Sequence, residues 1–219
     1  MKFIFPIRLF ITYLVSIVLL FIIFIAKSTA NAGDLNCHPK PNFVKTQYII
    51  AYGSLMQQKS KNSTDSSSGK NKPVEVYGYQ RGWFAKGVST GFSTTYLGII
   101  KNRNAHFNST IFPLATADSL KNYDKREKYY CRVAVPKKDI HPLDCSQLPN
   151  GEFWIYELKP SYYAEPSAKY PIVESYVDIF LSGCLEIQDK FNLNNFAAEC
   201  IATTNNWSSH WVNDRIYPR

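Results

Sequence analysis

The chain has 219 residues, of which 45% are hydrophobic and 19% charged, and it carries a formal net charge of +8 at pH 7. Once an N-terminal targeting segment is set aside, roughly 170 to 190 residues remain, which suits one domain with an apolar core. The lysines are dispersed rather than grouped with stacking aromatic residues. The composition therefore argues against a nucleic-acid partner and leaves only a modest attraction for small anions.

The N-terminus has the pattern of a secretory signal. Residues 1–8 carry two basic side chains, and residues 9–26 carry no charge. A basic region followed by an apolar run is typical of a signal peptide. Residues 30–32 then form an A-x-A pattern, which predicts cleavage after position 32 and a mature chain that begins at Gly33.

An uncleaved anchor is the alternative, because the uncharged run approaches the length of a membrane-spanning helix. In either case basic residues precede the apolar run, so the domain is expected outside the cytoplasm, periplasmic, extracellular or held at the membrane. Removal of residues 1–32 takes away three basic and no acidic residues and lowers the net charge to +5. Residues 33–46, with Pro39 and Pro41, are expected to form a linker to a domain at residues 47–219.

The five cysteines predict disulfides rather than a metal site. They occur at Cys37, Cys131, Cys145, Cys184 and Cys200, without a C-x-x-C pair or a histidine at ligand spacing. This pattern argues against zinc, and no metal is expected. In an oxidising compartment we predict a Cys184–Cys200 bridge between neighbouring helices and a Cys131–Cys145 bridge. The odd count leaves at least one free thiol, and spacing alone does not fix the connectivity.

The segment Gln47–Met56 (QYIIAYGSLM) predicts a buried strand that ends at a glycine turn. Residues 48–51 are mostly β-favouring and apolar, and Gly53 lets the backbone turn at Tyr52–Leu55. Such a turn can leave successive N–H groups unpaired, as a donor array suited to a carboxylate or an oxyanion. Taken alone, an ordinary strand followed by a loop is the simpler interpretation.

The middle of the chain predicts further strands and one short helix. Gln57–Lys72 has sixteen residues and no apolar side chain, so we expect a solvated, mobile loop that could cover the turn as a flap. Pro73–Trp83 predicts a strand broken by Gly78 and Gly82. The remaining elements are strands at Thr94–Lys101 and Ala105–Leu114, a helix at Ala115–Asn122, and strands at Tyr129–Val135 and Phe153–Leu158.

The C-terminal part predicts helices. From Tyr170, with Pro171 in the first turn, apolar residues recur every four positions and predict an amphipathic helix. Asn195 is a candidate cap for a second helix over FAAECIATT, and an irregular basic tail follows. Five or six short strands followed by two helices predict an α+β domain whose sheet curls into a barrel.

Few residues have a spacing that predicts catalysis. The histidines are scattered, and Ser54 lacks the second glycine of a G-x-S-x-G nucleophile elbow, which argues against a serine hydrolase. The stretch Tyr123–Val135 (YDKREKYYCRVAV) carries a D-x-x-E pair, Asp124 and Glu127, where a helix gives way to a strand. One carboxylate can hydrogen-bond the turn while the other faces inward. In isolation a solvated surface is the simpler interpretation, because basic residues surround the pair.

Four ordered blocks resemble the γ-glutamylcyclotransferase-like superfamily. They are AYGSLM at 51–56, VYGYQRGW at 76–83, FNSTIFPL at 107–114 and YDKREKYYCRV at 123–133. SYVD at 175–178, GCLEI at 183–187 and WVNDRIYPR at 211–219 are similar to bacterial members, so the resemblance covers nearly all of Gln47–Arg219. The chain departs from the commoner pattern at Asn108 and Ser109, where glycine often stands, and at Tyr129, which replaces another frequent glycine; both changes bear on the shape of the pocket.

The resemblance implies a small mixed β-barrel with helices outside it and a single acid/base group. Glu127 would be the catalytic carboxylate, and main-chain amides of Tyr52, Gly53, Ser54 and Leu55 would hold the γ-glutamyl group. The implied reaction is an intramolecular transamidation in which the substrate's α-amine attacks its γ-carbonyl. It would convert a small-molecule γ-glutamyl compound, such as glutathione, to 5-oxoproline and a free amine, amino acid or peptide, without a metal or organic cofactor.

The roles of three neighbouring residues and of the whole domain leave alternatives open. Tyr130 is a second candidate for the site, as a hydrogen-bonding wall of the pocket. Asp124 is interpreted as structural, and Tyr176 as a core residue of its helix. A non-catalytic module of the same fold that binds γ-glutamyl groups or small anions is the first rival, and an envelope-interaction protein is the second. Glu127 favours the enzyme, because a pure binder needs no carboxylate facing an anionic glutamyl group.

Overall fold

The computed structural model describes residues 37–87, 94–116 and 118–216. Its strands are β1 (Gln47–Ala51), β2 (Lys72–Lys86), β3 (Thr95–Pro113), β4 (Tyr130–Ala134), β5 (Ile140–Pro142), β6 (Glu152–Leu158), β7 (Ile172–Val173), β8 (Thr204–Asn205) and β9 (Trp211–Val212). Its helices are α2 (Gln58–Asn62), α3 (Ser119–Arg126), α4 (Glu174–Phe191) and α5 (Phe196–Ala202), with 3₁₀ turns η1 (Ser54–Met56), η2 (Lys137–Asp139) and η3 (Pro160–Tyr162). The predicted signal segment at residues 1–32 lies outside the described residues. Within them, no helix is both long and apolar enough to span a bilayer.

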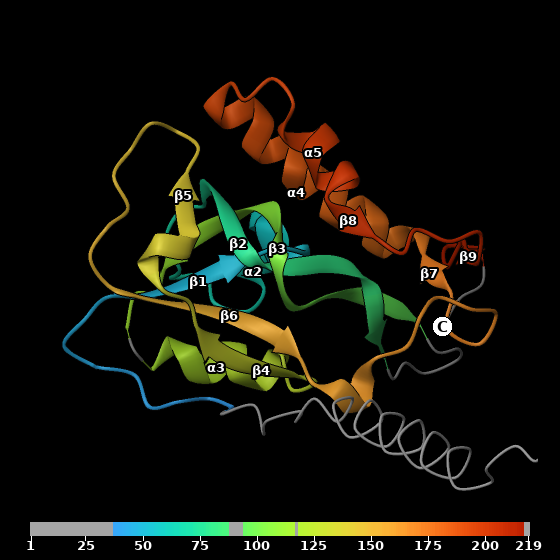
Figure 1. The fold of residues 1–219 in the computed structure, drawn as a ribbon, viewed down its shortest axis with the longest axis horizontal. Coiled ribbons are helices and arrows are strands. Elements are labelled where there is room, and N and C mark those ends of the chain that lie inside the picture. The colour runs from blue at the N-terminus through green and yellow to red at the C-terminus, as the bar shows by residue number, and fades with distance from the viewer. Residues whose placement is uncertain (1–36, 88–93, 117, 217–219) are drawn as a thin grey trace, which may run out of the picture. The chain divides into compact units, whose positions relative to one another are not determined.

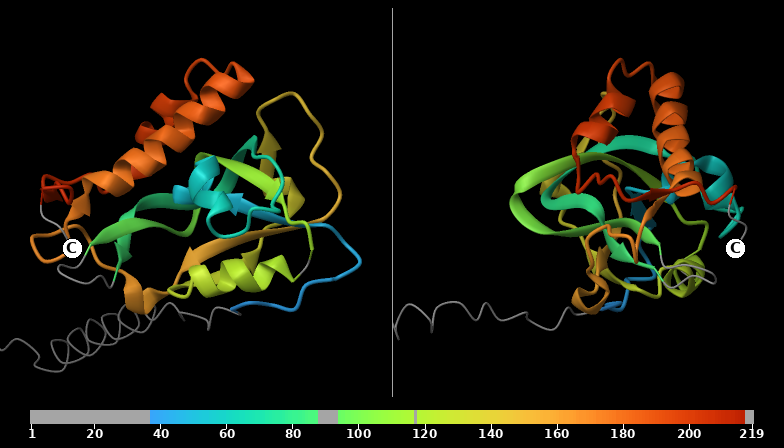
Figure 2. Two further views of the ribbon diagram at one scale, coloured as in Figure 1. Left: turned by 180° about the vertical axis from the view of Figure 1, so that it is seen from behind. Right: turned by 90° about the vertical axis from the view of Figure 1, so that its right-hand side faces the viewer.

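The strands form one mixed sheet in the order β4-β6-β1-β3-β2-β5, with β7, β8 and β9 attached to its side. The neighbours along this path pair antiparallel except β1 and β6, which run parallel from Gln47 opposite Glu152. The long β2–β3 hairpin curls over the shorter strands (Figure 2). The predicted α+β fold with a curled mixed sheet is confirmed, although the hydrogen-bonded path between β4 and β5 stays open within the described residues.

Helices cover the sheet from two sides (Figure 1). Helix α4 crosses one side together with α5, and α3 lies beside β4 and β6. A Cβ at Gly183 of α4 would lie 2.6 Å from the backbone nitrogen of Gln57, so glycine lets this helix pack directly against the chain that leaves η1. Helix α4 ends at Asn192, whose left-handed backbone (φ 53°) provides the C-cap.

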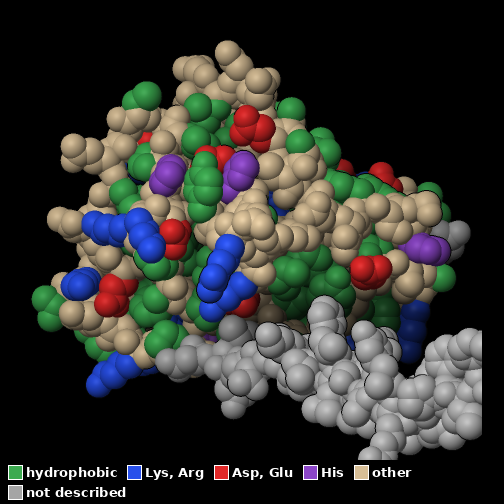
Figure 3. Space-filling model, in the orientation of Figure 1, with side chains coloured by type: hydrophobic (Ala, Val, Ile, Leu, Met, Phe, Trp, Pro, Cys, Tyr) green, Lys and Arg blue, Asp and Glu red, His purple; other side chains and the backbone are tan. Residues whose placement is uncertain are grey.

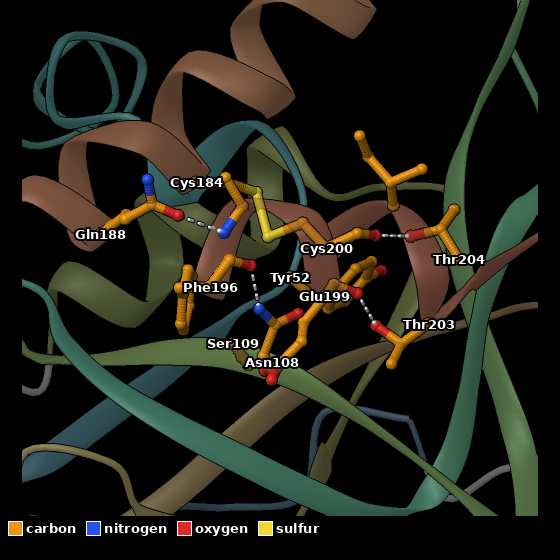
Figure 4. Close-up of a disulfide and its surroundings, with 12 residues drawn as sticks. Tyr52, Asn108, Ser109, Cys184, Gln188, Phe196, Glu199, Cys200, Thr203 and Thr204 are labelled. Carbon is orange, nitrogen blue, oxygen red and sulfur yellow. Dashed lines mark hydrogen bonds between the residues drawn. A yellow bond between two sulfur atoms is a disulfide. The ribbon is translucent and has the colours of Figure 1, made fainter. Parts of the chain in front are cut away.

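A disulfide joins the two C-terminal helices. Cys184 on α4 is bonded to Cys200 on α5, and both are fully buried (Figure 4), which confirms the predicted pair. Asn108 on β3 donates through Nδ2 to the Phe196 carbonyl at 2.6 Å and so ties α5 to the sheet. The bridge joins α4 to α5, and the hydrogen bond holds α5 against β3.

The second disulfide differs from the prediction. Cys131 on β4 is bonded to Cys37, and Cys145 is an exposed free thiol, so the predicted Cys131–Cys145 pair is wrong. Cys131 lies 94 residues from Cys37 in the sequence, and at this separation the spacing of the cysteines does not predict which of them pair. The His38 N–H also donates to the Arg132 carbonyl at 3.0 Å, so the start of the described chain is fastened to β4. Two disulfides indicate an oxidising compartment.

The strand boundaries also differ from the sequence analysis. Thr95–Pro113 is one long strand rather than two, because β2 pairs with it along its length. Gly78 does not break β2; it takes φ +86° at a bulge between Tyr77 and Tyr79, and the strand continues to Lys86. Pro171 is not in a helix, because residues 172–173 form β7 and α4 begins at Glu174.

The polar segment after η1 is also more ordered than expected. It contains α2, and Lys61, Ser68 and Asn71 are buried, so the expectation of a wholly solvated loop is wrong. Lys61 Nζ donates to the Gly69 carbonyl and to Asn71 Oδ1, and it lies 4.7 Å from the centre of the Phe112 ring. Burial lowers the pKa of Lys61 to about 8. These contacts argue against a freely moving flap.

Candidate active site

A pocket opens at the carboxyl end of β1, where the strand passes into η1. It holds about 320 Å³ of empty space, part of which is open solvent. It is lined by Ile50, Ala51, Tyr52, Gly53, Ser54, Leu55, Leu97, Glu127, Tyr130, Tyr156 and Tyr176. The structure therefore brings all of the sequence-predicted site residues into one lining.

Side chains from β2 and β3 hold the end of β1. Ser109 Oγ donates to the Ala51 carbonyl at 2.8 Å. Arg81 is fully buried, and its Nη1 donates to the carbonyls of Asn108 at 2.8 Å and Tyr52 at 3.4 Å. Burial lowers the pKa of Arg81 to about 9, so the guanidinium stays charged at neutral pH. Ser109, one of the positions where glycine often stands, and Arg81, which also donates to the Asn108 carbonyl, thus fasten the end of β1.

No hydrogen bond inside the turn takes up the N–H groups at its start, and that of Ser54 hydrogen-bonds to the Tyr176 hydroxyl. Inside η1 the first backbone hydrogen bond runs from the Met56 N–H to the Gly53 carbonyl at 3.0 Å. The N–H groups of Gly53, Ser54 and Leu55 lie at the start of this turn, so no carbonyl group within the turn accepts from them. Small residues at the start of a helical turn form a donor array of the kind that binds anionic oxygen.

Tyr176 closes one side of the turn. A Cβ on Gly53 would lie 2.9 Å from its hydroxyl, so any larger residue there would displace the Tyr176 side chain. Burial and the charge of Glu127 raise the pKa of Tyr176 to about 12, and hydrogen bonds from Ser54 partly offset this. The interpretation of Tyr176 as core was incomplete, because the same helix face packs on the sheet and lines the pocket.

Glu127 lies at the junction of α3 and β4. Its N–H donates to the Tyr123 carbonyl and its carbonyl accepts from the Tyr130 N–H, each at 2.8 Å, so the backbone is held on both sides. Its side chain is 17% exposed, and Arg126 Nε lies 3.2 Å from its Oε1. Burial raises the pKa of Glu127 above its ordinary 4.5, and the charge and hydrogen bond of Arg126 offset only part of this. A carboxyl group in this state suits acid/base chemistry.

Tyrosines form the wall around this carboxyl group. The Tyr52 hydroxyl donates to the Tyr156 carbonyl at 2.6 Å, and the Tyr130 hydroxyl donates to the Leu97 carbonyl at 2.8 Å. Burial raises the pKa of Tyr52 and of Tyr130 well above 10, so both stay neutral. Each hydroxyl oxygen can still accept a hydrogen bond, for example from an amine.

Asp124 lies outside the pocket lining, on the face of α3 toward β4 and β6. Its carboxylate accepts from Arg132 Nε at 2.9 Å and from the Tyr156 hydroxyl at 2.8 Å. His38 Nδ1 lies 3.1 Å from Oδ1. Burial alone would raise the pKa of Asp124, but the hydrogen bonds from Arg132 and Tyr156 outweigh it and lower the pKa below 3.8. These contacts fit a structural carboxylate.

Tyr156, Tyr176 and Arg126 were not predicted from the sequence as residues of the site. Tyr156 lies in β6 among buried residues on both faces, so strand alternation gave no signal. Tyr176 follows the helical period of the core. Arg126 was one of several charges in a polar run, and only its contacts separate it from its exposed neighbours Lys125 and Lys128.

The described residues offer no metal site. No group of three or more His, Cys, Asp or Glu side chains among them could hold an ion. Away from the pocket, Tyr77 contacts the rings of His106 and His141, and Glu75 Oε1 lies 3.4 Å from His106 Nε2. Figure 3 shows histidine and acidic side chains close together on one face of the molecule.

Comparisons with known proteins address the fold. No family model and no curated protein matches the chain. A solved γ-glutamyl cyclotransferase superposes with a TM-score of 0.56 at 12% identity, over 79% of this chain and 96% of that one. The chain has the γ-glutamylcyclotransferase-like fold. An uncharacterized protein from Homo sapiens gives a TM-score of 0.53 at 12% identity, over 78% of this chain and 95% of that one.

A third structure with this γ-glutamylcyclotransferase-like fold is YkqA from Bacillus subtilis, with a TM-score of 0.52 at 14% identity, over 72% of this chain and 53% of that one. The resemblance predicted from the sequence blocks is thus confirmed at the level of the fold. Identities this low carry no residue roles, so the roles of Glu127 and of the turn rest on their geometry.

Proposed function

We propose that the protein is an intramolecular cyclotransferase that cleaves γ-glutamyl compounds to 5-oxoproline and a free amine, amino acid or peptide. One observation carries the proposal: the buried carboxyl group of Glu127 shares a pocket with the backbone donors of Gly53–Leu55. The fold supports it, because a solved structure of this fold is named a γ-glutamyl cyclotransferase.

The chemistry needs one group that accepts a proton and then returns it. The substrate's α-amine is mostly protonated at neutral pH, so a base must remove a proton before the nitrogen attacks the γ-carbonyl. A bond then forms between the α-nitrogen and the γ-carbon, and the bond from the γ-carbon to the leaving nitrogen breaks. Between the ammonium group and the lactam the α-nitrogen loses two protons, and the leaving nitrogen gains two as it departs as an ammonium group. Glu127 accepts each proton from the attacking nitrogen and returns it to the leaving nitrogen in turn, so the enzyme ends in its starting state.

Most of the remaining work is orientation. Nucleophile and electrophile belong to one molecule, so a pocket that folds the glutamyl chain into an attacking shape lowers the barrier through geometry. The N–H groups of Gly53, Ser54 and Leu55 would bind either the α-carboxylate or the oxygen of the tetrahedral intermediate. Tyr52 and Tyr130 would form a wall of the pocket, with hydroxyl oxygens able to accept from the α-amine.

A panel of γ-glutamyl substrates tests the proposal. We expect the purified protein to release 5-oxoproline from at least one γ-glutamyl peptide, dipeptide or amine, measured by chromatography, with equal amounts of the free amine. Glutathione belongs in the panel. Binding of panel members by calorimetry without any 5-oxoproline would instead identify the rival, a non-catalytic module for γ-glutamyl groups or small anions.

We also propose that the domain acts outside the cytoplasm after removal of residues 1–32. The two disulfides support an oxidising compartment. Intact-mass measurement of the protein from its native host is expected to give a chain that starts at Gly33. A mass that includes residues 1–32 would favour a membrane anchor instead.

A further inference from the structure

Arg126 makes contacts that its exposed neighbours do not. Its Nη2 donates to Ser54 Oγ at 3.0 Å and to Ser60 Oγ at 3.1 Å. Its Nη1 donates to the Ser60 carbonyl at 2.9 Å and to Thr64 Oγ1. Its Nε faces Glu127 Oε1 at 3.2 Å. A guanidinium has five N–H donors, and here they meet five oxygen atoms.

These oxygen atoms belong to three separate parts of the chain. Ser54 is in the turn after β1, Glu127 ends α3, and Ser60 and Thr64 belong to the polar segment around α2. Sequence positions 54 and 126 are 72 residues apart, yet one rigid planar group joins them. A planar fork fixes the angles between its acceptors as well as their distances, which a lysine ammonium does not.

We propose that Arg126 is a positioning residue of this site: it sets the carboxyl group of Glu127 against the Ser54 turn and couples both to the α2 segment. The inference rests on the proposed function for its kinetic consequences. Arg126 is absent from the pocket lining, so it acts through Glu127 and Ser54 and not on the substrate.

The surroundings of Glu127 single out Arg126 as its ionic partner. The tyrosines whose pKa responds to its charge come from four parts of the chain: Tyr52 after β1, Tyr130 on β4, Tyr156 on β6 and Tyr176 on α4. All four have raised pKa values and stay neutral. Among the described residues, Arg126 is the cation that lowers the pKa of Glu127. Its removal should therefore raise that pKa further.

The proposal also gives the α2 segment a role. Ser60 and Thr64 accept from the end of the guanidinium opposite Glu127, so the segment holds the fork in place. The carboxyl group of Glu127 would then be well placed only when the α2 segment is ordered. A segment that served only as a solvated connection would need no such contacts.

The test compares Arg126→Gln with Lys125→Gln, which removes the same charge from the next, exposed residue. For Arg126→Gln we expect the plateau of kcat/KM to fall about 10- to 100-fold, mainly in kcat, and its acidic limb to move to higher pH. For Lys125→Gln we expect neither change. A plateau and limb in Arg126→Gln that match those of Lys125→Gln would overturn the proposal.

A direct titration separates this inference from the proposed function. The Glu127 carboxyl carbon, followed by NMR in glutamate-labelled protein and assigned with Glu127→Gln, should titrate at higher pH in Arg126→Gln than in Lys125→Gln. An unchanged titration overturns the positioning role. If the titration shifts while the unaltered protein turns over no γ-glutamyl substrate, the proposed function fails and the role of Arg126 stands.

Arg126→Lys covers the case in which Arg126→Gln does not fold. It keeps the charge but loses the fork, so we expect the acidic limb to stay near its original pH while the plateau falls several-fold. A plateau equal to that of the unaltered protein would overturn the proposal, because charge alone would then suffice.

Discussion

Asp124 and Glu127 leave the same short helix toward two different environments. Asp124 turns to β4 and β6, where Arg132 and Tyr156 donate to it and lower its pKa. Glu127 turns to the pocket, where burial raises its pKa and Arg126 offsets only part of the effect. Two carboxyl groups three positions apart are thus prepared for opposite uses, one for holding the fold and one for moving a proton.

The difference also predicts opposite effects on stability. A lowered pKa means that ionised Asp124 stabilises the fold above the pKa of the unfolded chain, and this contribution is lost as pH falls through the lower folded value. A raised pKa means that the folded state favours protonated Glu127, so its ionisation at neutral pH reduces stability. A mutation at each position should therefore separate activity from stability.

The largest effect is expected for Glu127→Gln. Loss of the acid/base group should lower kcat for 5-oxoproline release by about 10²- to 10⁴-fold. The free energy of unfolding at pH 7 should stay the same or rise, because no charge is left in the partly dry pocket. Turnover by chromatography and urea unfolding measure the two quantities.

Glu199→Gln provides the matched control, since the same change is made at an exposed position on α5. It should alter neither turnover nor unfolding. Full activity in Glu127→Gln would remove Glu127 from the mechanism and leave the contrast with Asp124 purely structural.

Asp124→Asn should give the reverse result. The Arg132 side chain is 4% exposed, and loss of its carboxylate leaves a nearly buried cation without its ionic partner. We expect the free energy of unfolding to fall by about 1 to 3 kcal/mol at pH 7, with kcat changed far less than in Glu127→Gln.

Unfolding of Asp124→Asn at several pH values tests the direction of the pKa shift of Asp124. The deficit relative to the unaltered protein should be full at pH 6 to 8 and should shrink below about pH 4, where aspartate in the unfolded chain is protonated. A deficit that persists unchanged at pH 3, or a kcat loss as large as that of Glu127→Gln, would contradict the structural interpretation of Asp124.

Parts of this comparison could be read from the sequence. The strand before YGSL, the helix-to-strand change around the D-x-x-E pair and the Cys184–Cys200 bridge follow from apolar patterning and local spacing. The order of the four sequence blocks predicted the γ-glutamylcyclotransferase-like fold, which the TM-scores confirm. Glu127 and the turn were predicted to meet, and they line one pocket.

Other features depend on contacts between distant residues that leave no local pattern. Lys61 is buried because its ammonium lies over the Phe112 ring and donates to the Gly69 carbonyl, and neither contact is visible in a polar run. Cys37 pairs with Cys131 because the first described residues return to β4. Tyr176 shares the helical period of the core, so periodicity could not separate a pocket residue from a packed one.

The smallest expected effect concerns a third carboxyl group, Glu157 on β6. It is 6% exposed, its Oε2 has no hydrogen-bond partner among the described residues, and burial raises its pKa as it does for Glu127. It does not line the pocket, however. Glu157 therefore tests whether burial alone makes a carboxyl group functional, or whether the turn and Arg126 are needed as well.

Glu157→Gln should raise the free energy of unfolding at pH 7 by about 1 kcal/mol, because an ionised carboxylate without a full set of partners no longer has to be buried. The gain should vanish near pH 4, where the glutamate is neutral in the folded state as well, and 5-oxoproline release should not change. Urea unfolding at the two pH values measures the difference. A loss of turnover equal to that of Glu127→Gln would mean that the proton chemistry extends beyond the pocket, and the contrast between Glu127 and the other carboxyl groups would then be wrong.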